Sequence, residues 1–413
     1  MAISYFQCSK CGMKFDPAEV SYVCPACSGN LDTHFDFETN PGLVNQQEIL
    51  TSREFSLWRY APLLAVPDPG FGHTPLHRVG FTPVYQSGRL RAELGLRRLF
   101  IKDDSPNPSA SFKDRASAIV ITRAVAKKIE TIIAASTGNA GAAMACMAAS
   151  VGKRAIILAP RTAPPAKIAQ LLTFGAEVIL VDGSYDQAFD LSIQASETFG
   201  WYNRNTGYNP FTVEGKKTAG LEIWEQVARR LSSDENLTVF IPVGDGNILS
   251  GIAKGFADLL ALGWIEKLPR LVGVQAEGSA AIYNAFHENK DQIEAVNAKT
   301  VADSISVDLP RDGLRALRRV RQSGGFFLTV SDQEILAAIP ALGKVGLFVE
   351  PAAATAWAGL VKALRERLID PEDPVLVMST GSGLKDINAA MKAVPAAPII
   401  EPTLQNLKEI LHV

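Results

Sequence analysis

The chain has 413 residues, of which 47% are hydrophobic and 20% charged, and it carries a net charge of −2 at neutral pH. This length and composition are typical of a globular protein of two or three domains. The small net charge gives no general attraction to nucleic acid or to an anionic membrane, and no apolar stretch approaches the ~18 residues of a membrane span. We therefore expect no nucleic acid and no membrane among its partners.

Four of the five cysteines lie near the N-terminus, in the pattern Cys8-x-x-Cys11 followed by Cys24-x-x-Cys27. Two such pairs supply four thiolates in tetrahedral geometry, and zinc is the metal they usually bind, although iron accepts the same ligands. Because the segment is too short for a substantial apolar core, we predict that residues 1–34 form a zinc-ribbon-like unit with a structural metal. Clustered cysteines favour a reducing compartment, and the N-terminus lacks the features of a secretory signal, so we expect a cytoplasmic protein.

A metal ribbon can instead bind nucleic acid, and the charge of this unit bears on that alternative. Lys10 and Lys14 are offset by Asp16 and Glu19, so the unit has no basic patch. A nucleic-acid-binding ribbon is therefore the less favoured interpretation. The four cysteines also leave no coordination position open, so the metal is not expected to be catalytic.

Residues 35–100 are rich in proline and aromatic side chains and are interpreted as a wrapping segment; short β-branched runs then alternate with helical patterns. Strands are predicted at 99–102, 131–135, 155–158, 178–181, 239–243, 271–275 and 375–378. Helices are predicted at 116–128, 139–150, 165–174, 185–199, 216–231, 248–261, 312–322, 332–339 and 352–367. This alternation predicts an α/β protein of two lobes, with parallel sheets flanked by helices and a ligand cleft at the carboxyl ends of the strands.

Lys113 stands where a helix opens, within Ser111-Phe112-Lys113-Asp114-Arg115. Alone, it is most simply a solvated residue in the first turn of that helix. Three further polar turns also follow predicted strands: Ser136-Thr137-Gly138-Asn139, Gly244-Asp245-Gly246-Asn247 and Ser379-Thr380-Gly381. Each could be an ordinary cap or βα turn, and Asp245 suits a phosphate only if its side chain points away. Together they indicate a site for an anionic, carbonyl-bearing cofactor, because a lysine amine forms Schiff bases and free backbone N–H groups bind phosphate and carboxylate.

These motifs resemble those of the fold-type II enzymes that use pyridoxal 5′-phosphate, and most closely those of the threonine synthases. The resemblance covers almost the whole chain, including the cysteine ribbon that some members carry. It extends to Thr74-Pro75-Leu76, Asn209-Pro210, Glu214-Gly215-Lys216-Lys217-Thr218, Glu350-Pro351-Ala352-Ala353 and Thr380-Gly381-Ser382-Gly383-Leu384-Lys385-Asp386. It implies a large cofactor-binding domain formed by residues 35–100 and 206–413, a smaller mobile domain at 101–205, and a possible homodimer.

The resemblance also implies a role for each motif. Lys113 would be the catalytic Schiff-base lysine, and Asn139 would hydrogen-bond the 3′-oxygen of the cofactor. Gly244, Asp245, Gly246 and Asn247 would form the cup for its phosphate, and the Thr380 hydroxyl would face the pyridine nitrogen. The substrate would be bound by Ser111, Ser136 and Thr137. A hydroxyl at the pyridine nitrogen favours elimination and replacement over transamination, and the implied reaction converts O-phosphohomoserine and water to threonine and phosphate.

Several positions depart from the family pattern. Ala110 and Ala116 stand where glycines usually flank the lysine motif, and Ser382 stands where many threonine synthases have histidine. The turn at 244–247 is one residue shorter, a length found in serine and threonine dehydratases. The alternatives are therefore β-replacement on a phosphoserine-like substrate, as in cysteate synthase, and dehydration of serine or threonine. A non-catalytic binding module is a further alternative, which the presence of Lys113 disfavours.

A distal substrate phosphate would need a basic partner, and the sequence leaves the choice open. The segment 203–208, just before Asn209-Pro210, also differs from the family pattern. The candidates are Arg161, Lys167, Arg204, Lys216 and Lys217. For most of them, solvation at the surface is the simpler interpretation.

Overall fold

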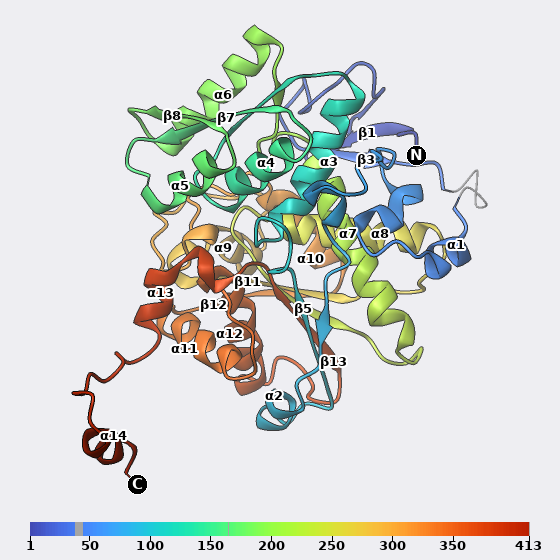
Figure 1. Cartoon of the computed structure of the whole chain (residues 1–413). Helices are drawn as coiled ribbons and strands as arrows, with labels where there is room; N and C mark the ends of the chain where they lie inside the picture. Colours follow the sequence, from blue (N-terminus) through green and yellow to red (C-terminus); the bar gives the residue numbers. More distant parts are fainter. Residues whose placement is uncertain (38–43, 164, 413) are drawn as a thin grey trace.

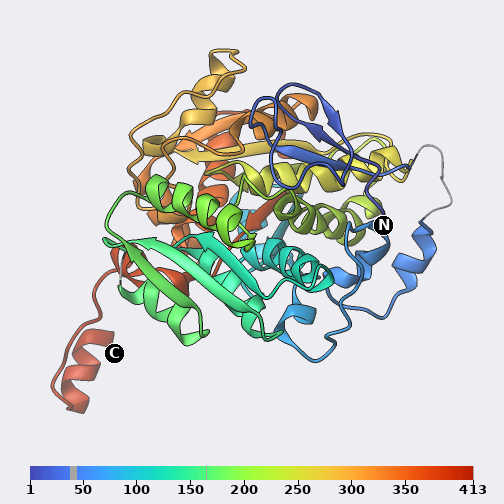
Figure 2. The same cartoon turned by 90° about the horizontal axis from the view of Figure 1, so that it is seen from above.

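The computed structural model describes residues 1–37, 44–163 and 165–412, which contain three sheets (Figure 1). A six-stranded sheet and a four-stranded sheet form the two lobes, and a small three-stranded sheet lies near the N-terminus. The predicted α/β class with parallel sheets is confirmed. Both views show the last helix, α14 (Leu404–Leu411), projecting from the body of the protein (Figures 1 and 2). Within the described ranges, no helix combines the length and apolarity that a membrane crossing requires.

The larger sheet has six strands, and its central strands are buried on both faces. Its order is β12 (Phe326–Val330), β11 (Arg270–Ala276), β10 (Thr238–Pro242), β13 (Pro374–Ser379), β5 (Arg98–Asp103) and β4 (Val84–Tyr85). All neighbours are parallel except β4, which is antiparallel to β5. One face packs on α7 (Phe211–Gln226), α8 (Asn247–Ala261) and α10 (Gly313–Gln322), and the other on α11 (Asp332–Gly343) and α12 (Pro351–Arg365). Burial on both faces explains the nearly continuous apolar runs that predicted these strands.

The smaller sheet is fully parallel, in the order β8 (Glu177–Val181), β7 (Arg154–Pro160), β6 (Thr131–Ala135) and β9 (Tyr202–Asn203). One face packs on α3 (Lys113–Ala126), α4 (Asn139–Ala149) and α5 (Pro165–Thr173), and the other on α6 (Tyr185–Phe199). Strand β5 pairs with β13 along its whole length, so the smaller sheet begins only after residue 103. The division into domains at residue 101 stays a prediction.

The N-terminal sheet is antiparallel, in the order β2 (Lys14–Phe15), β1 (Tyr5–Cys8) and β3 (Leu31–His34). It contacts both lobes. Arg315 of α10 donates to Asp32 at 2.6 Å, while Asn30 donates to the Gly207 carbonyl at 2.6 Å and Tyr22 accepts from the Asn203 backbone N–H at 3.0 Å. The predicted ribbon is thus a brace between the lobes rather than a separate appendage.

Most predicted elements lie within a few residues of their predicted bounds, and the largest shift is in α7. We predicted this helix at 216–231, whereas it begins at Phe211, because the Asn209 side chain accepts from the Phe211 N–H at 2.9 Å and Pro210 fixes the first turn. The prediction missed β12, the short strands β1, β2, β3, β4 and β9, and several short helices. These helices are α1 (Gln46–Thr51), α2 (Gly88–Glu93), α9 (Ala281–His287), α13 (Ile387–Lys392), α14 and the 3₁₀ turns at 57–63, 75–78, 228–230, 277–279, 303–305 and 383–385.

Candidate active site

A cavity of about 470 Å³ opens where the carboxyl ends of strands from both sheets face each other. Its wall brings together most of the predicted site residues, which lie far apart in the sequence. These are Lys113, Ser136, Thr137, Asn139, Gly244, Asp245, Gly246 and Asn247. The segments 204–206 and 303–309 and the residues Tyr185 and Arg311 also line it. This placement agrees with the rule that ligands of α/β sheets bind beyond the carboxyl ends of the strands.

Lys113 is held in place by its neighbours, while its own amine is unengaged. Asp114 accepts from the Ser109 N–H at 2.6 Å, and Arg115 donates to Asp104 at 2.6 Å and pairs with Glu222, all fully buried. Among the residues that the structure describes, none forms a hydrogen bond or an ion pair with the Lys113 amine. Burial lowers the pKa of Lys113, and the carboxylates of Glu350 and Asp245 oppose that shift. An amine with a lowered pKa and no partner is suited to act as a nucleophile or a base.

Ala110, just before the lysine motif, has a left-handed backbone with φ +64°. A Cβ in this region costs about 1–2 kcal/mol, which explains why glycine is the residue expected there. The strain is compatible with the fold because backbone bonds hold the loop: Ala110 accepts from the Ser382 N–H at 3.1 Å, and the Phe112 N–H donates to the Thr380 carbonyl at 2.8 Å. The C-terminal turn therefore fixes the position of the lysine loop.

Two predicted site residues, Ser111 and Thr380, are not among the described residues that line the cavity. Both are buried, and Ser111 forms a backbone bridge with Gly381. The Ser111 hydroxyl has no hydrogen-bond partner in the described part of the chain. Their predicted roles toward substrate and cofactor stay predictions.

The turn before α4 is tightly packed and carries Asn139. A Cβ at Gly141 would lie 2.4 Å from the Ser136 carbonyl oxygen, so only glycine permits this close turn. The Asn139 side chain donates to both Glu350 oxygens, at 2.9 and 3.0 Å. Burial raises the pKa of Glu350. Sequence reasoning noted Glu350 only as part of a motif, and its pairing with Asn139 across the lobes could not be found from spacing.

The turn before α8 forms a cup whose wall is made by backbone. A Cβ at Gly244 would lie 2.8 Å from Ile305 Cα, and Gly246 has φ +89°. Asp245 accepts from the Arg311 N–H at 3.1 Å, and burial raises its pKa. Asn247 accepts from Lys216 and donates to Asp312 at 2.8 Å, so its side-chain amide is already paired within the protein. The backbone N–H groups at the start of α8 remain the donors suited to an anion.

The five basic candidates separate clearly. Arg161 is exposed beside Asp182, Lys217 is buried against Glu214 and Asp258, and Lys167 pairs with Asp303. Only two of the candidates line the cavity: Arg204 and Lys216. Burial lowers the pKa of the Lys216 amine, and it lowers the pKa of the Arg204 guanidinium to about 10.

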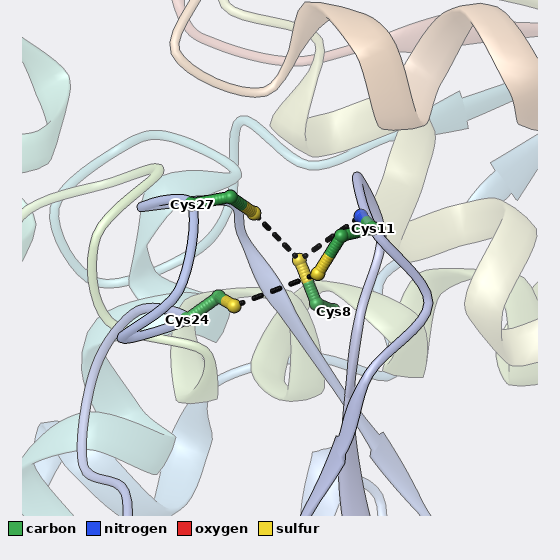
Figure 3. Close-up of side chains that lie close together, drawn as sticks. All are labelled: Cys8, Cys11, Cys24 and Cys27. Atoms are coloured by element: carbon green, nitrogen blue, oxygen red, sulfur yellow. Dashed lines mark hydrogen bonds between the residues drawn. The ribbon is translucent and has the colours of Figure 1, made fainter.

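The four N-terminal cysteines converge as their spacing predicted (Figure 3). Their sulfur atoms all lie within 4.8 Å of one another, and the Cys8–Cys27 and Cys11–Cys24 pairs are 3.5 and 3.7 Å apart. Backbone N–H groups of Lys10 and Cys11 donate to the Cys8 sulfur at 3.4 and 3.5 Å. These separations suit four ligands at ~2.3 Å from one tetrahedral metal. The fifth cysteine, Cys146, is buried in α4, where burial raises its thiol pKa to about 12.

Comparisons with known proteins agree with this geometry. A family profile described as pyridoxal-phosphate dependent enzyme matches residues 76–381. The chain is 37% identical over 408 residues to a threonine synthase of Methanocaldococcus jannaschii, covering 98% of each chain. It is 33% identical over 411 residues to a threonine synthase of Methanosarcina acetivorans, again covering 98% of each. Its fold is similar to that of threonine deaminase isoform 2 from Solanum lycopersicum, with a TM-score of 0.66 at 23% identity over 78% of this chain and 86% of that one.

Proposed function

The chain belongs to the family of pyridoxal-phosphate dependent enzymes, and we propose that it catalyses the threonine synthase reaction, converting O-phosphohomoserine and water to threonine and phosphate. Relatives named threonine synthase that match nearly end to end support this substrate. The observation that carries the proposal is the unengaged amine of Lys113, which lies in the same cavity as two turns whose backbone N–H groups are suited to anions.

The cavity fits pyridoxal 5′-phosphate on the chemistry of its own groups. Lys113 offers a free amine for the cofactor's aldehyde, and the turn at Gly244–Asn247 offers backbone N–H groups in a cup that a Cβ at Gly244 would fill. The Lys216 amine beside that turn bonds to a neutral amide rather than to a carboxylate, so it can donate to a phosphate. Once bound, the cofactor withdraws electrons from the substrate's α-carbon, which makes its proton acidic.

The residues of the chain supply binding, orientation and proton transfer. We assign the substrate α-carboxylate to Ser136, Thr137 and the N–H groups at the start of α4. This leaves the Cα and Cβ protons of the substrate to the Lys113 amine, whose lowered pKa makes more of it unprotonated at neutral pH. If Thr380 faces the ring nitrogen, as the resemblance implies, it would offer a hydroxyl rather than a carboxylate and would not hold that nitrogen protonated. Departure of the Cγ phosphate, return of protons to Cγ and Cα, and addition of water at Cβ complete the reaction.

A substrate panel tests this proposal. The purified enzyme loaded with pyridoxal 5′-phosphate is offered O-phosphohomoserine, O-phosphoserine, serine and threonine, and phosphate, keto acid and amino-acid products are measured. The proposal expects phosphate and threonine from O-phosphohomoserine. Formation of 2-oxobutanoate from threonine as the faster reaction would instead support a dehydratase, and sulfite-dependent replacement on O-phosphoserine would support a cysteate synthase-like enzyme.

For the four-cysteine site we propose zinc in a structural role, supported by four converging sulfur atoms that fill a tetrahedral shell. Elemental analysis of freshly purified protein tests this and separates zinc from iron. We also expect the protein in the cytoplasm, and a homodimer in solution, which sedimentation measurements would test.

A further inference from the structure

Arg204 is a buried arginine that lines the cavity. It follows β9 directly, and only 1% of its surface is exposed. Its Nε donates to the Ser117 hydroxyl of α3 at 3.1 Å, and its Nη1 donates to the Thr206 hydroxyl at 2.8 Å. Its Nη2 has no hydrogen-bond partner among the described residues. The guanidinium is therefore fixed by two neutral groups, with one donor edge unsatisfied.

The other deeply buried arginines each have carboxylate partners. Arg115 pairs with Asp104 and Glu222, Arg315 with Asp312 and Asp32, and Arg59 with Glu225. No carboxylate in the described ranges forms an ion pair with Arg204. Removing an unpaired cation from water is expensive, and burial accordingly lowers the pKa of Arg204. A buried cation that faces a cavity without a counter-ion is suited to an anionic ligand.

Lys216 is a second basic group in this cavity that has no carboxylate partner among the described residues, and the positive charges of Lys113 and Arg204 add to the effect of burial in lowering its pKa. Lys216 and Arg204 thus add two basic groups to the cavity beside Lys113, which favours anionic ligands. Lys216 bonds to Asn247 in the turn that would hold the cofactor phosphate. Arg204 is held from the side of the smaller sheet, by α3 and by the residues after β9.

We propose that Arg204 binds the distal phosphate of the substrate, with its unpaired Nη2 as a donor. This inference rests on the proposed function, because it names the residue that selects a phosphorylated substrate. Arginine suits the task, since its planar guanidinium matches a phosphate with parallel N–H donors. The cofactor also carries a phosphate that an arginine could bind. We assign the cofactor phosphate to the glycine turn at Gly244–Asn247, because the Lys216 amine lies beside that turn.

The test compares Arg204→Gln and Arg204→Lys with the matched control Arg161→Gln, which removes an exposed arginine outside the cavity. All proteins are loaded with cofactor, and their thermal midpoints establish that they fold. A charge-assisted hydrogen bond is worth roughly a 10- to 150-fold change in affinity. Arg204→Gln should therefore raise KM for O-phosphohomoserine by about 10- to 100-fold, Arg204→Lys by less, and the control should match the wild type.

Two binding measurements separate the sources of phosphate. Inorganic phosphate should raise the thermal midpoint of the cofactor-loaded wild type, and it should raise that of Arg204→Gln by less. The affinity for the cofactor, followed by its absorbance, should be nearly the same in the wild type and in Arg204→Gln. The inference is overturned if KM for O-phosphohomoserine is unchanged in Arg204→Gln, or if the variant loses affinity for the cofactor rather than for the substrate. Neither result would affect the proposed function. If Arg204→Gln does not fold, an Arg204→Lys enzyme with wild-type KM and wild-type phosphate response overturns it. A wild-type enzyme that releases no phosphate from any phosphorylated amino acid overturns the proposed function itself.

Discussion

The cysteine ribbon and the cavity between the lobes each bring together side chains that lie far apart in the sequence, but they differ in what those side chains can hold. In the ribbon, four sulfur atoms converge within 4.8 Å, and one tetrahedral metal satisfies all of them. In the cavity, Lys113, Lys216 and Arg204 line a space of about 470 Å³. The ribbon is suited to a permanent ligand that stabilises the fold, and the cavity to ligands that exchange. Mutations in the two regions should therefore affect different quantities.

The largest effect is expected from Lys113→Ala, which removes the unengaged amine from the cavity. Turnover should fall by at least about 10³-fold because both the attachment point and the base are lost. Stability should change little, since no described residue bonds to the amine. Phosphate release and thermal denaturation are the measurements, and borohydride reduction with peptide mapping should mark Lys113 in the wild type. A Lys113→Ala enzyme with normal turnover contradicts the mechanism.

Cys24→Ser is the corresponding change in the ribbon. Loss of a thiolate should abolish tight metal binding and destabilise the protein by several kcal/mol, because metal binding and ribbon folding are coupled. The buried Cys146→Ser is the matched control, since it removes a thiol outside the cluster. Elemental analysis and denaturant unfolding measure both effects. Full metal content in Cys24→Ser would show that the four cysteines do not act as one site.

A third change, Glu350→Gln, alters the pKa of the Lys113 amine without removing the amine itself. The Glu350 carboxylate raises the pKa of Lys113 against the lowering effect of burial. Removing the charge should lower the pKa of Lys113 further, so the amine should lose its proton at a lower pH than in the wild type. The acidic limb of the kcat/KM profile should therefore move to lower pH. A limb that stays in place or moves to higher pH would argue against Lys113 as the titrating base.

The smallest effect is expected where the two regions touch. Tyr22 of the ribbon accepts from the Asn203 N–H at 3.0 Å, next to Arg204. Tyr22→Phe loses a bond worth ~1 kcal/mol, and we expect a slightly lower unfolding free energy with a KM increase of a few-fold. Tyr5→Phe is the control, because the Tyr5 ring stacks on His34 and its hydroxyl bonds to none of the described residues. Equal behaviour of the two variants would mean that the ribbon does not position Arg204.

Local features of the sequence were sufficient to predict the ribbon and the central lysine. The spacing of the four cysteines is enough to predict that their sulfur atoms converge. The apolar pattern is enough to predict that a helix begins near Lys113. Asp312 beside Asn247, and Glu350 beside Asn139, depend on segments that only the tertiary fold brings together. Strand β12 was missed although Phe326–Val330 is aromatic and β-branched and follows two glycines, which is a strand signal.

The basic residues illustrate the same limit. From sequence, Arg161, Lys167, Arg204, Lys216 and Lys217 were equivalent candidates for a phosphate partner. Their partners separate them: four bond to carboxylates or to a side-chain amide, and Arg204 retains an unpaired donor in the cavity. Charge pairing between distant segments, which no periodicity encodes, therefore decides which cation is available.

The most direct test of the account is the product stoichiometry from O-phosphohomoserine. Phosphate and threonine are measured together in the wild type and in Lys113→Ala, with cofactor in excess. The account predicts equal amounts of the two products from the wild type and neither product from the variant. Phosphate released without threonine, or no phosphate released by the wild-type enzyme, would contradict it.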